Sequence, residues 1–146
     1  YIRKNILDIS ITTDLIVGFP YEDDNLFNET INFLNKIKFS KIHVFPYSRR
    51  KGTKADLMDN QIDEQTKHKR VKEVLKLSEE LEIEYMNKFI NTDVLVLIEK
   101  FENGIISGHT ENYIPVKANG VESDINELLM IHIDKMEYPY LIGNKL

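Results

Sequence analysis

The stretch that organises the chain is Lys41-Ile42-His43-Val44-Phe45-Pro46-Tyr47-Ser48-Arg49-Arg50-Lys51-Gly52-Thr53. It predicts a short buried strand that stops at Pro46, which cannot donate to a ladder, and then a basic loop closed by Gly52-Thr53. Residues 31–55 contain no Asp or Glu. They carry seven cations: Lys36, Lys38, Lys41, Arg49, Arg50, Lys51 and Lys54. In a chain of net charge −5, this concentration of positive charge where a strand ends predicts contact with an anion.

A second stretch, residues 13–20, has the same character, an apolar strand that ends in Gly18-Phe19-Pro20. Residues 11–17 are β-branched and aliphatic with little alternation, which predicts a strand covered on both faces. Asp23 and Asp24 can cap the next element. Its apolar residues recur every three or four positions, which predicts an amphipathic helix: Phe27, Ile31, Leu34 and Ile37.

The loop after Pro46 has roughly 16 residues, longer than an ordinary connection and therefore predicted to be functional. Asp63 is a plausible cap for a long helix that runs to about residue 90 and is bent, broken or shared between two units. Its predicted apolar stripe is Val71, Val74, Leu75, Leu81, Tyr85, Met86 and Phe89. Residues 1–90 thus predict a β-α-β-α order with a parallel sheet. Two strands cannot close such a sheet, so a missing N-terminal part, which we favour, or a second copy supplies the others.

After Asn91 the pattern changes to short strands separated by turns. The predicted strands are residues 92–101, 105–110, 112–118, 128–134 and 136–142. Asn103-Gly104 is a strong hairpin signal, and Asn119-Gly120 repeats it. Five strands in this length predict a small OB-like β-barrel. The predicted fold is therefore α/β, a partial parallel β/α barrel in residues 1–84, followed by an all-β barrel in residues 85–146.

Composition excludes several kinds of site. The chain has no cysteine, so it has no disulfide, no thiolate nucleophile and no cysteine-held cluster. His68, His109 and His132 have no metal-ligand spacing, and His43, within an apolar strand, is predicted to be a core residue rather than a ligand. Without a long apolar run or a signal peptide, we expect a soluble cytoplasmic protein. The first residue, Tyr1, is not Met, and we expect a fragment of a longer protein.

Charge divides unevenly along the chain. Residues 1–61 carry nine Lys and Arg against eight Asp and Glu, whereas residues 91–146 carry four against nine. A polyanion should therefore prefer the first half.

Several separated motifs together resemble one family. Asp14-Leu15-Ile16-Val17-Gly18-Phe19-Pro20, with Glu22, Phe27 and Glu29-Thr30, is similar to a late barrel strand and helix of the radical S-adenosylmethionine methylthiotransferases. Residues 41–53 match their next strand and loop. Gly108-His109-Thr110-Glu111-Asn112-Tyr113 and Tyr140-Leu141-Ile142-Gly143 resemble their C-terminal TRAM domain, an RNA-binding barrel. The combination is most similar to the branch that methylthiolates threonylcarbamoyladenosine in tRNA, with the isopentenyladenosine branch as the nearer competitor and the ribosomal-protein branch further away.

The resemblance implies the back half of an enzyme. In the family, S-adenosylmethionine and 4Fe-4S clusters serve the chemistry, and the cluster cysteines lie on earlier strands, so this chain alone is expected to hold no metal and to catalyse nothing. Its implied partners are tRNA and the missing N-terminal half. The family usually has Gly after Phe-Pro, whereas this chain has Tyr21, which changes the backbone freedom of that turn.

The resemblance also suggests candidate residues. Val17, Gly18 and Phe19, with Phe45 and Tyr47, would contact the cofactor. Arg50 could hold a carboxylate or phosphate. The residues expected to contact RNA are Arg49, Arg50, Lys51, Asn112, Tyr113 and Lys117, with Lys100 as a possible addition. For the cofactor candidates the alternative is an ordinary buried strand end, and for the basic residues it is a solvated loop. For the whole chain the alternatives are a non-catalytic RNA-binding or scaffold module and a purely structural domain.

Overall fold

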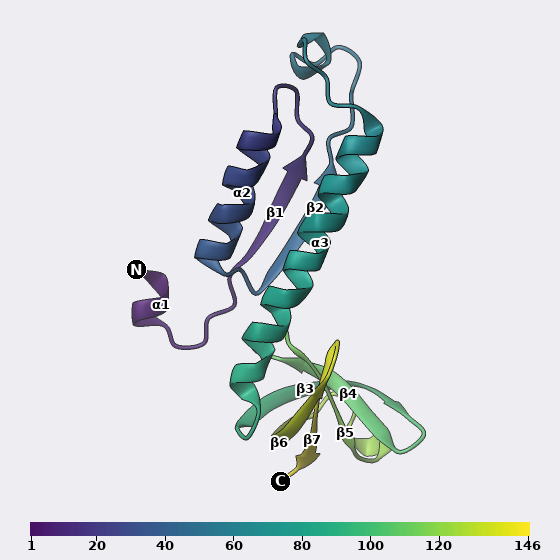
Figure 1. Ribbon diagram of the computed structural model, residues 1–146. Helices are drawn as coiled ribbons and strands as arrows, with labels where there is room; N and C mark the ends of the chain where they lie inside the picture. The colour runs from purple at the N-terminus through teal and green to yellow at the C-terminus, as the bar shows by residue number, and fades with distance from the viewer. The chain divides into compact units, whose positions relative to one another are not determined.

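The computed structural model describes all 146 residues, which form two compact units (Figure 1). One unit comprises residues 11–82, and the other comprises residues 83–146 together with residues 1–10. The helix α3, Glu64–Met86, contributes to both units, as the sequence predicted for a shared helix. None of the helices has the length and hydrophobicity that a membrane crossing requires.

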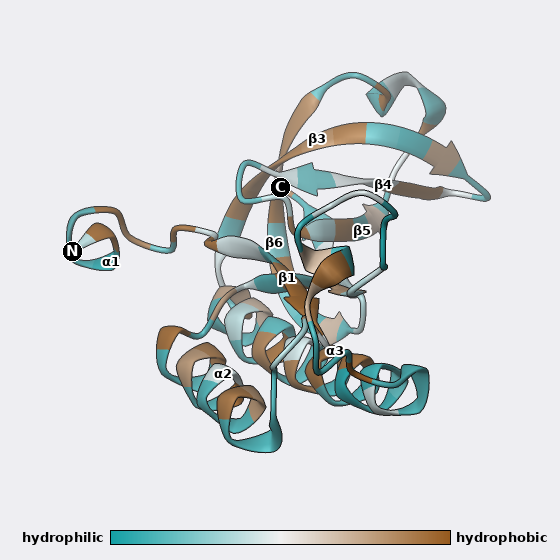
Figure 2. Cartoon of the chain, turned by 90° about the horizontal axis from the view of Figure 1, so that it is seen from above, coloured by the Kyte–Doolittle hydropathy of each residue, from teal (hydrophilic) through white to brown (hydrophobic).

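The first unit is built on a two-stranded parallel sheet of β1, Thr12–Val17, and β2, Lys41–Pro46. The helices α2, Asp24–Ile37, and α3 cover one face of this sheet (Figure 1). The buried core between them is Val17, Phe27, Leu34, Ile42, Val74 and Leu81. In Figure 2, α2 shows the alternation of hydrophobic and hydrophilic segments that an amphipathic helix requires.

Both helix starts confirm the predicted caps. The Asp23 carboxylate accepts a hydrogen bond from the Leu26 amide at 2.9 Å, and the Asp63 carboxylate accepts one from the Thr66 amide at the same distance. The predicted apolar stripe on α3 is wrong at Leu75, which is 51% exposed. Val74 is fully buried, and the helical rotation of about 100° per residue carries its neighbour away from the sheet. Between β2 and α3 the long loop contains one 3-10 turn, η1, Ala55–Leu57.

The prediction that the sheet is covered on both faces is wrong within this chain. Ile16 and Phe45, which pair in register, are 57% and 53% exposed. His43 is exposed too, so its assignment to the core is also wrong. Because side chains alternate along a strand, the inward positions of β2 go to Ile42 and Val44, and His43 lies on the open face.

The second unit is a closed barrel of five strands, which confirms that prediction. The strands are β3, Asp93–Glu102; β4, Ile105–Thr110; β5, Pro115–Asn119; β6, Leu128–Glu137; and β7, Tyr140–Lys145. They pair in the order β3-β4-β5-β7-β6, and all pairs are antiparallel except β5 with β7. The barrel core is Val96, Ile98, Ile106, Ile114, Val116, Ala118, Ile131, Ile133 and Leu141, joined by Tyr85, Met86 and Phe89.

Short elements complete this unit: α1, Ile2–Asn5; η2, Asn87–Phe89; and η3, Glu122–Asp124. Asn103 and Gly104, at φ 52° and 84°, form the predicted two-residue turn. The signal at Asn119-Gly120 does not make a hairpin but leads into η3. A predicted strand over residues 136–142 is also wrong, because the chain turns at Tyr138-Pro139 between β6 and β7. Because apolar residues lie on both sides of that turn, the sequence pattern resembles a single strand.

Candidate functional site

An open cleft of about 640 Å³ lies at the carboxyl ends of β1 and β2. Its lining is mostly apolar: Ile16, Phe19, Phe45, Pro46, Tyr47, Ser48, Arg50, Thr53 and Ala55. The rings of Phe19 and Tyr47 meet edge to face, with centroids 5.1 Å apart. Arg50 places a guanidinium among these side chains. The cleft can therefore accept a flat apolar group beside an anionic one.

The turn after β1 is held by ion pairs around one buried arginine, Arg70. The Gly18 amide donates to the Glu22 carboxylate. Arg70, 4% exposed, donates to the Glu22 carbonyl at 2.7 Å, to the Glu22 carboxylate at 3.2 Å and to Asp24 at 2.9 Å. Because a buried guanidinium needs partners on its nitrogens, this arrangement fixes the turn that presents Phe19 to the cleft.

Lys67 packs directly beneath the end of β1. It is 3% exposed, and its Cγ lies 2.4 Å from the position that a Cβ on Gly18 would take. Its Nζ lies 5.4 Å from the centroid of the Tyr47 ring and 2.8 Å from Glu64. The Tyr47 hydroxyl is buried and has no hydrogen-bond partner. Polar groups thus lie directly behind the aromatic wall of the cleft.

The supporting residues Lys67 and Arg70 were not predicted from the sequence. They lie among the charges of α3, which is typical of a solvated helix face. One signal was available, because positions 67, 70 and 74 follow the three- and four-residue spacing of a single helix face, and Val74 is its fully buried member.

The basic loop divides its three adjacent cations between different roles. Arg49 donates from Nε to the Asp56 carboxylate and from Nη2 to the Asp56 carbonyl, both at 2.6 Å. The hydrogen bond from Arg49, followed by one from the Gly52 amide, lowers the pKa of Asp56 below its usual value of 3.8. Arg49 therefore closes the loop, whereas Arg50 lines the cleft and Lys51 is exposed.

The cofactor candidates occupy two places around the strand ends. Phe19, Phe45 and Tyr47 line the cleft together, and Ile16, which was not predicted, joins them. Val17 is fully buried in the core, where its carbonyl accepts from the Tyr47 amide at 2.8 Å.

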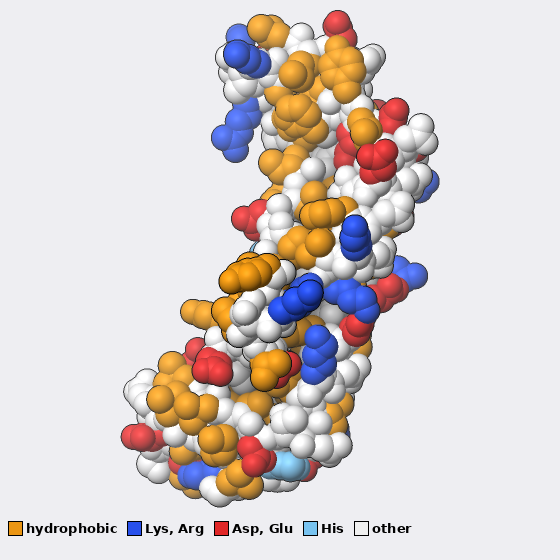
Figure 3. Space-filling model, turned by 90° about the vertical axis from the view of Figure 1, so that its left-hand side faces the viewer, with side chains coloured by type: hydrophobic (Ala, Val, Ile, Leu, Met, Phe, Trp, Pro, Cys, Tyr) orange, Lys and Arg blue, Asp and Glu red, His pale blue; other side chains and the backbone are white.

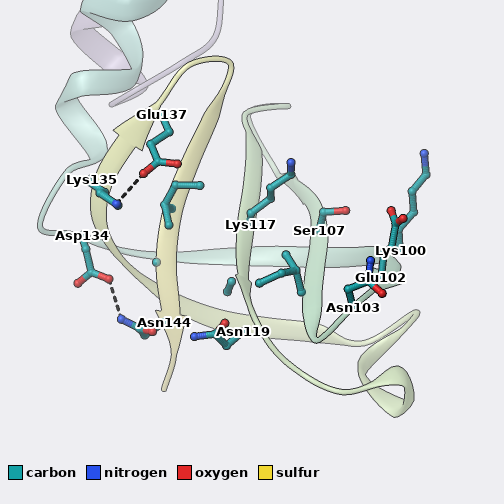
Figure 4. Close-up of a pocket in the computed structure, with 14 residues that line it drawn as sticks. Lys100, Glu102, Asn103, Ser107, Lys117, Asn119, Asp134, Lys135, Glu137 and Asn144 are labelled. Atoms are coloured by element: carbon teal, nitrogen blue, oxygen red, sulfur yellow. Dashed lines mark hydrogen bonds and ion pairs between the residues drawn. The ribbon is translucent and has the colours of Figure 1, made fainter.

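A second hollow, of about 650 Å³, lies on the outer surface of the barrel (Figure 4). Strand register places Lys100, Ser107 and Lys117 in one row across β3, β4 and β5. The Lys117 Nζ lies 3.8 Å from the centroid of the Tyr140 ring. Lys135 also lines the hollow and pairs with Glu137 at 2.6 Å. Three of the four cations in residues 91–146 therefore gather on one surface of the barrel, together with the carboxylates of Glu102, Asp134 and Glu137.

The other barrel candidates lie elsewhere. Asn112 lines a different hollow, of about 560 Å³, together with residues 6–9. Tyr113 is 85% exposed at φ 60°, and its ring centroid lies 6.4 Å from that of His109. No group of three or more His, Asp or Glu side chains could hold a metal ion.

Comparison with known proteins decides the family. No family model matches the chain. It is 40% identical over 97% of its length to the threonylcarbamoyladenosine tRNA methylthiotransferase of Bacillus subtilis. With the same coverage, it is 39% identical to the ribosomal protein uS12 methylthiotransferase of Clostridium perfringens and 38% identical to the tRNA-2-methylthio-N(6)-dimethylallyladenosine synthase of Caldicellulosiruptor saccharolyticus.

The chain is a relative of the methylthiotransferases. The resemblance inferred from residues 14–20, 41–53 and 108–113 is confirmed. The chain spans about a third of the length of these curated methylthiotransferases.

Proposed function

We propose that this chain is the C-terminal part of a radical S-adenosylmethionine methylthiotransferase that acts on an adenosine in tRNA. The observation that carries the proposal is the 40% identity over 97% of the chain to the Bacillus subtilis enzyme. Its name favours threonylcarbamoyladenosine as the substrate. The relative named for ribosomal protein uS12 is 39% identical, so the experiment must distinguish between these substrates.

In this proposal, residues 1–84 end the catalytic β/α barrel and residues 85–146 form a TRAM-like domain. The open face of the β1–β2 sheet supports the first assignment. Parallel strands are normally covered on both faces, and here the apolar pair Ile16 and Phe45 is exposed. The N-terminal remainder of the enzyme would supply the strands that continue the barrel.

The cleft suits the adenosyl part of S-adenosylmethionine, which supplies the radical and the methyl group when bound. Active sites of β/α barrels lie at the carboxyl ends of strands, where this cleft opens. Phe19, Phe45 and Tyr47 would pack against the adenosyl group, with Val17 and Gly18 shaping the strand end and Arg50 within reach of a carboxylate. The 4Fe-4S clusters do not fit this chain, which has no cysteine, so we expect it to be inactive alone.

The tRNA would contact two surfaces. On the first unit, the residues that contact it would be Arg50 and Lys51, whereas Arg49 forms an ion pair with Asp56. On the barrel, Lys100 and Lys117 would meet phosphates, while Asn112 and Tyr113 would offer an amide and a stacking ring. Tyr113 holds φ 60° although it is neither Gly nor Asn, and strain of this kind gathers at functional sites. The enzyme would work in the cytoplasm.

Disruption of the gene that encodes this chain tests the proposal. Total tRNA is digested to nucleosides and examined by mass spectrometry, and ribosomal protein uS12 is examined in the same cells. We expect loss of 2-methylthio-threonylcarbamoyladenosine, with its unmethylthiolated precursor accumulating and uS12 unchanged. Loss of the dimethylallyladenosine product or of uS12 methylthiolation would reassign the substrate. If all three persist, the chain is a non-catalytic RNA-binding or scaffold module.

A further inference from the structure

The barrel carries an apolar patch that the proposed function leaves without a role. Leu95 and Leu97 on β3 lie in register with Met130 and Leu128 on β6. The four side chains are 42–61% exposed, while Val96, between the two leucines of β3, and Ile131, next to Met130, are fully buried in the core. Directly paired positions share a face of the sheet, so the four form one block on the outside of the barrel. Figure 3 shows hydrophobic side chains gathered on the barrel, with acidic ones among them.

The patch continues into the hollow of about 560 Å³ through Leu95. Residues 6–9 also line that hollow, and Ile6 and Leu7 among them are 53% and 87% exposed. This segment is attached to the barrel unit by a hydrogen bond of 2.5 Å from the Tyr85 hydroxyl to the Asp8 carbonyl. A flat apolar block next to a hollow with a mixed polar and apolar lining can receive a row of side chains from one element.

The border of this surface is acidic. Asp93 and Glu99 mark the two ends of the block, each in contact with a histidine, His132 at 2.6 Å and His109 at 2.9 Å. Asp8, Asp93 and Glu111 line the hollow, where Lys88 is the only Lys or Arg. The Lys88 Nζ lies 5.4 Å from the centroid of the Tyr85 ring. Acidic groups therefore outnumber basic ones around an apolar centre.

We propose that the β3–β6 patch and the adjoining hollow dock an amphipathic helix of a protein partner, apolar on one side and rich in Lys or Arg at its margins. Its apolar side chains cover Leu95, Leu97, Leu128 and Met130, and its cations meet Asp93, Glu99 and Glu111. RNA is a poor occupant, because its phosphates would face these carboxylates. A second copy is disfavoured too, since it would bring the same acidic borders together.

The test uses the full chain and a labelled synthetic helix that has Leu on one face and Lys on the other. Binding is followed by fluorescence anisotropy. The matched probe has every Lys replaced by Glu. The variants are Leu97→Thr/Leu128→Thr and, as a second pair, Leu95→Thr/Met130→Thr. Ile105→Thr is the control, because Ile105 is also exposed but lines the Lys100 hollow.

We expect the Leu/Lys probe to bind the wild type. Each of the two double variants should weaken the affinity for this probe by about tenfold or more, and Ile105→Thr should leave the affinity unchanged. The Glu probe should bind at least tenfold more weakly, and the Met130 methyl resonance should shift only with the Leu/Lys probe. Equal binding of the two probes, or full binding by both double variants, overturns the proposal. So does a dimer that Leu97→Thr/Leu128→Thr dissociates, or a loss of tRNA binding in that variant.

Discussion

The cleft at the ends of β1 and β2 and the Lys100 hollow on the barrel have nearly the same volume, about 640 and 650 Å³, but opposite chemistry. The cleft has an aromatic wall in front of one buried ion pair, Arg70 with Glu22. The hollow has Lys100 and Lys117 on either side of Ser107 across a sheet surface, and its ion pair of Lys135 with Glu137 is 60% exposed on both sides. The buried ion pair behind the cleft positions the backbone, whereas Lys100 is exposed at the hollow, where a ligand can reach it.

The largest expected difference between the two regions comes from their ion pairs. Arg70→Ala leaves the Glu22 carboxylate, 14% exposed, without its cation, and should lower the free energy of unfolding by roughly 3 kcal/mol. Lys135→Ala on the barrel breaks a solvent-exposed pair and should lower it far less, because exposed ion pairs contribute little to stability. Urea denaturation followed by circular dichroism measures both. Equal losses would show that the buried network does not support the strand end.

The next largest loss of stability is expected from substitution of a glycine beside each region. A Cβ on Gly143 would lie 2.0 Å from the His132 carbonyl oxygen, which is backbone and cannot move aside, so Gly143→Ala should destabilise by roughly 2.5 kcal/mol. On Gly18 it would lie 2.4 Å from the Lys67 side chain, at φ +74°. Gly18→Ala should destabilise by about 2 kcal/mol, because the left-handed conformation adds to the overlap. Thermal unfolding ranks the two, and a neutral Gly18→Ala would disprove the close packing of Lys67.

Two exposed tyrosines carry backbone strain, one in each region. Tyr21 and Tyr113 have φ of 72° and 60°. Replacing either with Gly should raise the free energy of unfolding by about 1 kcal/mol, because Gly adopts positive φ without a steric penalty. If Tyr113 stacks on RNA, only Tyr113→Gly should also weaken tRNA binding. A gain in stability without any loss of binding would remove Tyr113 from the interface.

The smallest effects concern one carboxylate in each region. Hydrogen bonds, led by those from Arg49 and Lys145, lower the pKa values of Asp56 and Asp124 below 3.8. A carboxylate with a lowered pKa in the folded state stabilises the protein above its unfolded pKa, and that contribution is lost as the pH falls through the folded value. Stability should therefore fall below about pH 4, and Asp124→Asn should flatten this dependence. Urea denaturation at neutral and acidic pH measures this dependence. If the free energy of unfolding of Asp124→Asn changes with pH as steeply as that of the wild type, Asp124 does not contribute as proposed.

Features that depend on neighbours in sequence could be predicted. Asp23 and Asp63 cap helices, Asn103-Gly104 makes a tight turn, and β2 ends at Pro46, which lines the cleft. These depend on local backbone preferences and on side-chain hydrogen bonds across one turn.

Features that depend on which elements pack against a strand or helix in the tertiary structure could not be predicted. A hydrophobic strand does not specify whether one face or both are covered, so the exposure of His43, Ile16 and Phe45 was missed. Arg70 and Lys67 resemble solvated helix residues until Glu22 and Gly18 are brought against them. The Lys100 row required strand register, which composition alone does not contain.

The central claim is that the cleft serves the cofactor while the barrel lysines serve the tRNA. The most direct test restores the disrupted gene with Phe45→Ala or with Lys100→Ala/Lys117→Ala, and measures both the tRNA that copurifies with the enzyme and the methylthio nucleoside in total tRNA. Phe45→Ala should retain the tRNA and lose most of the methylthio nucleoside. The lysine variant should lose tRNA, more steeply as salt is raised. The account is contradicted if Phe45→Ala restores normal methylthiolation, or if the lysine variant copurifies with as much tRNA as the wild type.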